Sequence, residues 1–282
     1  MKSCEKFVSQ ESNYFIYYPS KTAQKMFLYP LYSGHFIYKS GYSLYRDSYD
    51  SFLLKYIKKG SFTLEFDGQT QQVSEGNFVL IDCYKPHAYY SDTGWESIWC
   101  HFDGVTARAH YSSIVSRLGN VFFLTDPYPV IKKLTAIYDT FYSGDVIKEP
   151  LLSKYLNDIL TSFHLYSPIN IMSRDHTNAV EEVISYINKH FTENITIADL
   201  AEKAGFSQYH FIRIFKKETG MTPYEYIINI RINTAKYLLR NSQLSVKDIC
   251  FSTGFSSESV FCNAFKKRLG ITPTEYRTLE EN

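Results

Sequence analysis

One sequence pattern occurs twice in the second half of the chain, and this repeat constrains the fold more than any other feature. The stretch from Ile197 to Tyr226 recurs as Val246 to Tyr276, at an offset of 49 that becomes 50 after one inserted residue. Both copies contain the strings G-F-S, F-K-K and T-P-x-E-Y in the same order. Such a repeat predicts two structural units of one kind in tandem.

Each copy has the sequence pattern of a helix-turn-helix. A Ser or Thr precedes each expected helix and supplies an N-cap oxygen, and Gly205 or Gly254 lies in the turn between the two helices. The expected caps are Thr196 and Ser245 for the first helices, and Ser207 and Ser256 or Ser257 for the second. The chain should therefore carry two recognition helices.

The segment between the two copies should form one long helix. Thr222 and Glu225 have the spacing of a capping box, and Pro223 fits the first helical turn. We expect this helix to run to about Arg240, which makes it about 25 Å long at 1.5 Å per residue. That length suits two recognition helices placed in successive major-groove segments about 34 Å apart.

The first half of the chain is expected to be rich in β-strands. Short segments of β-branched and aromatic residues alternate with turn signals from Asp50 to Phe102. Asp67-Gly68 is a dipeptide typical of a two-residue hairpin turn, and strands of this spacing favour a small barrel or sandwich. Apolar residues at helical spacing then predict two amphipathic helices between Pro129 and Tyr166.

The segment from about Asp175 to Arg277 resembles the DNA-binding domain of the AraC/XylS family of transcription regulators, because of its paired G-F-S, F-K-K and T-P-x-E-Y strings. The order of elements around Pro86-His87 and residues 95–102 resembles the cupin-like regulatory domain of the arabinose-type members. The expected fold is thus α+β with two domains. A cupin-like barrel closed by two helices precedes an all-α domain, in which a long helix joins two helix-turn-helix motifs.

The resemblance implies a cupin-like ligand-binding and dimerisation domain at 1–168, a linker at 169–174 and a DNA-binding domain at 175–282. It also implies a homodimer. We expect the helices between Pro129 and Tyr166 to form the dimer contact, since their apolar faces would otherwise be exposed. On this hypothesis a charge at Leu156 or Ile159 should give monomers.

The barrel could hold a small ligand, or side chains could fill it. Alternation along 95–102 places Trp95, Ser97, Trp99 and His101 on one face of the strand. An aromatic ring beside polar groups suits a sugar, although the same residues could be ordinary core. The candidate ligand-binding residues, matched loosely to related regulators, are Lys59, His87, Tyr89, Ser97 and Trp99.

An enzyme is the competing class for the barrel, because some cupins are metal-dependent oxygenases or isomerases. Their metal site needs an H-x-H pair, whereas His87 is followed by Ala88 and Tyr89. The five cysteines include no C-x-x-C pair and predict neither a disulfide framework nor a zinc ribbon. We therefore expect no catalysis, no metal and no cofactor. A third alternative is a regulator whose filled barrel responds to a protein partner, a lipid or no ligand.

Aligning each copy to the family motif places one set of side chains on the exposed face of each recognition helix. The expected DNA-contacting residues are Gln208, Tyr209, Ile212, Arg213, Lys216 and Lys217 on the first helix, and Glu258, Ser259, Cys262, Asn263, Lys266 and Lys267 on the second. Arg213 suits a guanine and Asn263 an adenine. From Asp175 onward the chain has 13 Lys and Arg against 13 Asp and Glu, so positive charge is local, and a merely solvated helix face is the alternative.

The leading hypothesis is a one-component regulator that binds double-stranded promoter DNA as a homodimer. We expect a small-molecule effector, a carbohydrate, and activation through RNA polymerase. The sequence has no run of about 18 apolar residues and no basic start followed by an apolar core, so we expect a cytoplasmic protein without membrane contact.

Overall fold

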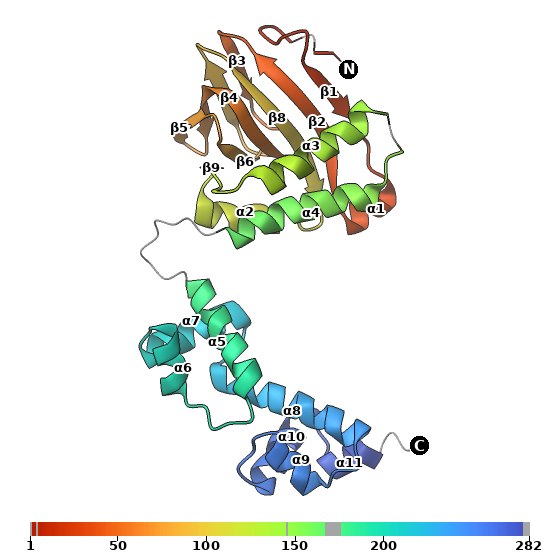
Figure 1. Ribbon diagram of the computed structural model, residues 1–282, viewed down its shortest axis with the longest axis vertical. Helices are drawn as coiled ribbons and strands as arrows, with labels where there is room; N and C mark the ends of the chain where they lie inside the picture. The colour runs from red at the N-terminus through yellow and green to blue at the C-terminus, as the bar shows by residue number, and fades with distance from the viewer. Residues whose placement is uncertain (1, 4, 145, 167–175, 279–282) are drawn as a thin grey trace. The chain divides into compact units, whose positions relative to one another are not determined.

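The chain divides into two compact units, residues 1–169 and 170–282. The computed structural model describes residues 2–3, 5–144, 146–166 and 176–278, so the expected linker at 169–174 lies outside the described residues. The first unit contains nine strands and four helices within these ranges, and the second contains seven helices (Figure 1). Of the helices in the described ranges, none has both the length and the apolar character needed to cross a membrane.

The strands of the first unit form two antiparallel sheets that share one long strand. The first half of β4 (Phe52–Phe66) pairs with β6 and β8, and its second half pairs with β5 and β7. The other strands are β1 (Asn13–Ile16), β2 (Leu28–Tyr38), β3 (Tyr42–Arg46), β5 (Gln69–Ser74), β6 (Phe78–Asp82), β7 (His87–Ser91), β8 (Trp95–Gly104) and β9 (Val121–Phe122). The cupin-like barrel is thus built around β4.

The predicted hairpin is confirmed. Asp67 and Gly68 have φ angles of 51° and 73°, and they join β4 to β5 in register, with Phe66 opposite Gln69. A two-residue turn whose central residues both have positive φ matches the right-handed twist of the strands. Strands β1 to β3 lie before Asp50, where no strand was predicted. In β2, Pro30 and Gly34 interrupt the apolar alternation.

Two separate apolar cores occupy the two faces of the larger sheet. The inner core lies inside the barrel and contains aromatic rings such as Phe36, Phe62 and Trp95. The outer core packs the sheet against the helices α2 (Ala107–Leu118), α3 (Tyr128–Tyr142) and α4 (Glu149–Leu165). Figure 1 shows these helices on one side of the strands, together with the short helix α1 (Lys21–Met26). The two predicted helices correspond to α3 and α4.

The expectation that Leu156 and Ile159 form a dimer contact is wrong. Both side chains are fully buried within one chain, in the core between α4 and the sheet. Their helix packs on β2 and on α3, so its apolar face is already covered without a second subunit. The residues of α3 and α4 that do point outward and are exposed include Tyr128, Tyr142 and Leu165.

The second unit contains two helix-turn-helix motifs joined by a long helix, as predicted. Its helices are α5 (His176–His190), α6 (Ile197–Ala204), α7 (Gln208–Thr219), α8 (Pro223–Asn241), α9 (Val246–Ser252), α10 (Glu258–Leu269) and α11 (Pro273–Thr278). The predicted capping box of α8 is present, because the Thr222 side chain accepts from the Glu225 N–H and the Glu225 carboxylate accepts from the Thr222 N–H. Thr196 caps α6 in the same way through Asp199.

Candidate functional site

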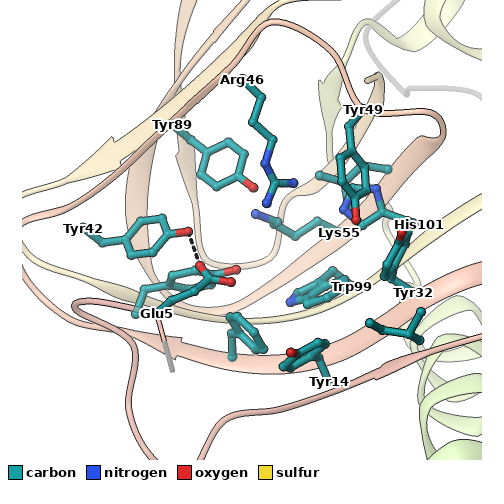
Figure 2. Close-up of a pocket in the computed structure, with 14 residues that line it drawn as sticks. Glu5, Tyr14, Tyr32, Tyr42, Arg46, Tyr49, Lys55, Tyr89, Trp99 and His101 are labelled. Carbon is teal, nitrogen blue, oxygen red and sulfur yellow. Dashed lines mark hydrogen bonds between the residues drawn. The ribbon is translucent and has the colours of Figure 1, made fainter. Parts of the chain in front are cut away.

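The barrel interior holds a cavity of about 220 Å³. Side chains from the N-terminal segment and from six strands line it, among them Tyr42 and Arg46 of β3, Lys55 of β4 and Tyr89 of β7. Figure 2 shows that these side chains point toward a common space above the ring of Trp99. The volume lies below the roughly 300–1,000 Å³ of pockets for drug-sized ligands, so the cavity suits a small molecule.

Two of the five expected ligand-binding residues, Tyr89 and Trp99, line this cavity. The alternation predicted for β8 also places Trp95 in the inner core, with Ile98 and Cys100 in the outer core on the opposite face. Space for the Trp99 indole comes from Gly34, its partner on β2. A Cβ atom at Gly34 would lie 2.3 Å from the Trp99 ring, so any other residue there would displace the indole.

The structure does not bring the other three expected residues to the cavity. Lys59 is exposed, and Ser97 is buried beside Trp99 but does not line the cavity. His87 lines a different, open depression near the β4–β5 turn, and its Nδ1 lies 2.9 Å from the carbonyl oxygen of Lys85. Of the expected set, Tyr89 and Trp99 are therefore the residues that face this cavity.

An irregularity in β4 explains why Lys59 points outward. The pairing of β4 with β8 shifts register between Ile57 and Lys59. Before this point the odd-numbered residues Leu53 and Ile57 belong to the inner core, whereas beyond it the even-numbered Phe62 does. An extra residue reverses the alternation of a strand.

Sequence reasoning missed Lys55, the basic residue that the alternation of β4 does direct inward. Its side chain is 2% exposed, and its Nζ lies 4.0 Å from the ring centroid of Tyr89. Burial lowers the pKa of Lys55 to about 7, because the charged amine loses its hydration. A lysine between Leu53 and Ile57, at a position of apolar alternation, is the signal that identifies it from the sequence.

The cavity contains one further cation and one carboxylate. Arg46 lies over the ring of Tyr49, with 4.6 Å between its Cζ and the ring centroid. The Tyr42 hydroxyl donates to Glu5 at 2.8 Å. His101 also lines the cavity, but burial holds its pKa well below the usual range, so its imidazole is neutral at pH 7.

The first recognition helix, α7, exposes the expected DNA-contacting residues. Tyr209 is 82% exposed, and Phe211 and Phe215 are fully buried on the opposite face. The remaining expected residues, Gln208, Arg213, Lys216 and Lys217, are exposed, and Ile212 is half-buried. Ser207 occupies the N-cap position, although its side chain makes no capping hydrogen bond. Basic groups thus lie on the outer face and at the end of this helix.

The second recognition helix, α10, has the same arrangement with a different chemistry. Ser257 caps it by accepting from the Val260 N–H, and Phe261 and Phe265 are buried. The expected residues Glu258, Ser259, Asn263, Lys266 and Lys267 are exposed, whereas Cys262 is half-buried and burial raises the pKa of its thiol. The first residue of α10, Glu258, is acidic, whereas the first residue of α7, Gln208, is neutral.

The two motifs pack into one unit through α8. Ile227 of α8 belongs to the core of the first motif, and Ile232 and Leu239 belong to the core of the second. The Arg231 guanidinium donates to the carbonyl oxygens of Phe191 and Glu193 at 2.8 Å each, which ties the segment after α5 to this helix. The connector therefore fixes the spacing of α7 and α10.

Comparison with known proteins gives matches over both units. Residues 33–139 match the family of AraC-like ligand binding domains, and residues 200–278 match a helix-turn-helix domain family. The Msm operon regulatory protein of Streptococcus mutans is 27% identical over 255 residues, which are 86% of this chain and 89% of that protein.

Two further proteins resemble the chain. The lactose operon transcription activator of Staphylococcus xylosus is 25% identical over 242 residues, or 80% of this chain and 83% of that protein. The solved DNA-binding domain of the transcriptional factor AdpA, crystallised with a target DNA, is 31% identical over 36% of this chain and 91% of that domain, with a TM-score of 0.35. The matches thus include regulators similar to this chain over most of its length.

Proposed function

Since the chain belongs to the AraC family of transcription regulators, with a ligand-binding domain and a helix-turn-helix domain, we propose that it activates transcription from a promoter in response to a small effector. The effector occupies the barrel cavity beside Trp99 and Tyr89. Two recognition helices, α7 and α10, enter successive major-groove segments. The observation that carries this proposal is the pair of exposed recognition faces held on one connector helix.

Each recognition helix contains groups suited to base edges and groups suited to phosphates. Arg213 on α7 has two donors that suit guanine, and Asn263 on α10 has a donor and an acceptor that suit adenine, so each can bind its base bidentately. Lys216, Lys217, Lys266 and Lys267 lie in the last turns of the two helices and are exposed. Such cations bind phosphates, and they position a recognition helix without reading the sequence.

A sugar is the effector class that the relatives favour. One of them carries lactose in its name and is a transcription activator, which supports both a carbohydrate effector and activation here. The barrel cavity supports it as well, because the Trp99 ring and several tyrosines lie beside polar groups. Activation requires contact with RNA polymerase, which we propose as a further partner.

We propose a homodimer on the basis of the family resemblance, with a contact different from the one expected from the sequence. The outward residues Tyr128, Tyr142 and Leu165 are 66%, 63% and 86% exposed, so α3 and α4 still present apolar side chains to a second subunit. Light scattering on the full chain and on Leu165→Glu tests this contact. A lower mass for the variant at unchanged thermal stability supports it, and an unchanged mass excludes it.

The test of the function is selection of DNA by the full-length protein. Purified protein should retain specific fragments of sheared genomic DNA, and the Arg213→Ala/Asn263→Ala double variant should not enrich them. The selected fragments then serve as templates for transcription in vitro with RNA polymerase and a panel of sugars. Enrichment that the double variant reproduces would contradict the assignment of the recognition helices.

A further inference from the structure

Two buried hydrogen-bond donors of the barrel cavity lack a hydrogen-bond partner in the described part of the chain. Lys55 Nζ and Trp99 Nε1 are both buried, and neither has a hydrogen-bond partner among the described residues. A buried donor without an acceptor costs free energy, and a buried ammonium costs more. Aromatic rings surround the amine, with the centroids of Tyr89 and Phe62 at 4.0 and 5.2 Å from Nζ. These rings compensate for part of the cost but provide no acceptor oxygen.

A second cation faces the same space. Arg46 extends from the end of β3 toward Lys55 and Tyr89 (Figure 2). In the described part of the chain it forms no ion pair, and its charge contributes to the lowered pKa of Lys55. Two neighbouring cations repel each other, so an anion between them would relieve the repulsion and satisfy the donors of both.

Among the described residues, no anionic side chain forms an ion pair with Lys55 or Arg46. Glu5 is exposed and accepts a hydrogen bond from Tyr42, and no ion pair joins its carboxylate to Lys55 or Arg46. Burial raises the pKa of the Cys83 thiol to about 12 and keeps the His101 imidazole neutral, so neither supplies a negative charge at pH 7. Burial raises the pKa of Tyr38, Tyr42 and Tyr89, so these cavity tyrosines are neutral at this pH.

We propose that the effector carries an anionic group, a carboxylate or a phosphate, bound between Lys55 and Arg46. The inference rests on the proposed function, because it takes the barrel cavity as the effector site. The remainder of the effector lies beside Trp99, whose Nε1 donates to an oxygen. The cavity of about 220 Å³ limits this remainder to a small body. The two cations favour sugar acids and sugar phosphates over uncharged sugars.

Matched pairs of ligands test the proposal on the full-length protein. The pairs are galactose with galacturonate and glucose with glucose 6-phosphate, and inorganic phosphate and acetate serve as minimal anions. Isothermal titration calorimetry and Trp fluorescence should show at least tenfold tighter binding for one acidic member than for its neutral partner. A preference for the uronate or for the phosphate ester identifies which anion the site takes.

Two lysine variants provide the matched comparison. Lys55→Met should weaken binding of the acidic ligand at least tenfold, whereas Lys59→Met, from the exposed part of the same strand, should bind it within about twofold of the wild type. The ligand-free Lys55→Met protein should melt at the same temperature or higher, because it lacks a buried amine without a partner. A purely structural role for Lys55 would instead lower the melting temperature of this variant.

Proton uptake gives a third readout. With a pKa of about 7, Lys55 is about half protonated at pH 7, and a bound anion holds it fully protonated. Titrations with galacturonate, whose carboxylate is fully ionised at pH 7, in two buffers of different ionisation enthalpy should therefore show proton uptake by the wild type and none by Lys55→Met. Binding without uptake would contradict contact between the anion and this amine.

The outcomes separate this inference from the proposed function. Tighter binding of a neutral sugar than of its acid, or equal binding of the acid by Lys55→Met, overturns the inference and leaves a sugar-responsive regulator. If no acid and no minimal anion binds, the inference also fails. If no member of either class perturbs Trp fluorescence while DNA binding persists, the effector part of the proposed function fails as well.

Discussion

The barrel and the helical domain place their functional side chains in opposite environments. On α7 the relevant residues lie within one segment of ten residues, 208–217, and most are exposed. In the barrel, Arg46, Lys55 and Trp99 come from three different strands, and Lys55 and Trp99 are almost fully buried. A surface site of this kind tolerates substitution without loss of the fold, whereas substitutions in a buried polar site change stability and binding together.

The largest expected effect is in the barrel domain. Leu156→Asp places a charge in the core between α4 and the sheet, where Leu156 is fully buried, and it should unfold this domain. Loss of the leucine alone costs about 2–5 kcal/mol, and the unpaired charge adds to it. Circular dichroism and thermal melting measure the loss. Leu151→Asp, at a position 39% exposed, is the control and should melt close to the wild type. Well-folded monomers of Leu156→Asp would restore the dimer hypothesis for this face.

Within the helical domain, Gly254 and Gly270 allow a comparison of a crowded glycine with an uncrowded one. Gly254 has φ of 85°, and a Cβ atom there would lie 2.7 Å from backbone atoms of Thr192. Gly270 has φ of 79°, but its Cβ would meet nothing within 4 Å. Gly254→Ala should therefore lower the free energy of unfolding by about 3 kcal/mol, and Gly270→Ala by about 1 kcal/mol. Urea unfolding followed by circular dichroism measures both. Equal effects would mean that the two motifs do not pack through Thr192.

The buried lysine predicts a pH dependence that the surface lysines do not share. Since the pKa of Lys55 is about 7 in the folded protein and near its ordinary value when unfolded, the unfolded chain binds more protons between these values. Stability should therefore rise with pH above 7, by about 2 kcal/mol from pH 7 to pH 9. Urea unfolding at both pH values gives the free energy of unfolding of the wild type and of Lys55→Met. The difference between the two proteins is the contribution of this amine. A difference independent of pH would place the amine in contact with solvent.

Substitutions on α7 should change DNA binding and leave stability nearly unchanged. Arg213→Ala should cost about 1–3 kcal/mol in binding and relax specificity at one base position, because on the proposed function the guanidinium reads a base edge. Lys217→Ala should weaken binding to all sequences alike and reduce the salt slope by about one. Fluorescence anisotropy at several salt concentrations measures both. The same loss of specificity in the two variants would contradict the division between base and phosphate contacts.

The smallest expected effect concerns the acidic side chain that distinguishes α10 from α7. Glu258 is exposed at the start of its helix. On the proposed function its charge repels DNA phosphates nearby. Glu258→Gln should therefore tighten DNA binding by about twofold to fivefold at low salt and by less at high salt. Glu218→Gln, at the exposed end of α7, is the matched control for a change of net charge. An equal gain from both variants would mean that Glu258 is not especially close to DNA.

The functional residues of the helical domain lie within one segment, whereas those of the barrel come from several strands. This difference explains why the sequence predicted the first set better than the second. Helical spacing places Phe211 and Phe215 inward and Arg213 outward, and caps such as Thr196 and Thr222 act within one turn, so local sequence was sufficient for α6 to α8. The barrel site depends on strand register. One irregularity between Ile57 and Lys59 turns Lys59 outward, and no local signal in the sequence predicts this irregularity.

Contacts between strands and helices that are far apart in the sequence could not be predicted from the sequence either. Gly34 is needed because Trp99 lies opposite it on a strand more than sixty residues away. The burial of Leu156 and Ile159 depends on helices packing on β2, which itself was not predicted. An amphipathic helix shows that one face is covered, but it does not show whether the same chain or a second subunit covers it.

Hydroxyl-radical footprinting of the full-length protein on a selected promoter fragment tests the account most directly. Two recognition helices fixed on α8 predict, for each chain, two protected stretches about one helical turn apart on one face of the duplex. Arg213→Ala should weaken protection at one stretch and Asn263→Ala at the other. A single protected stretch, or a pattern that neither substitution alters, would contradict the assignment of α7 and α10 as a tandem DNA-reading unit.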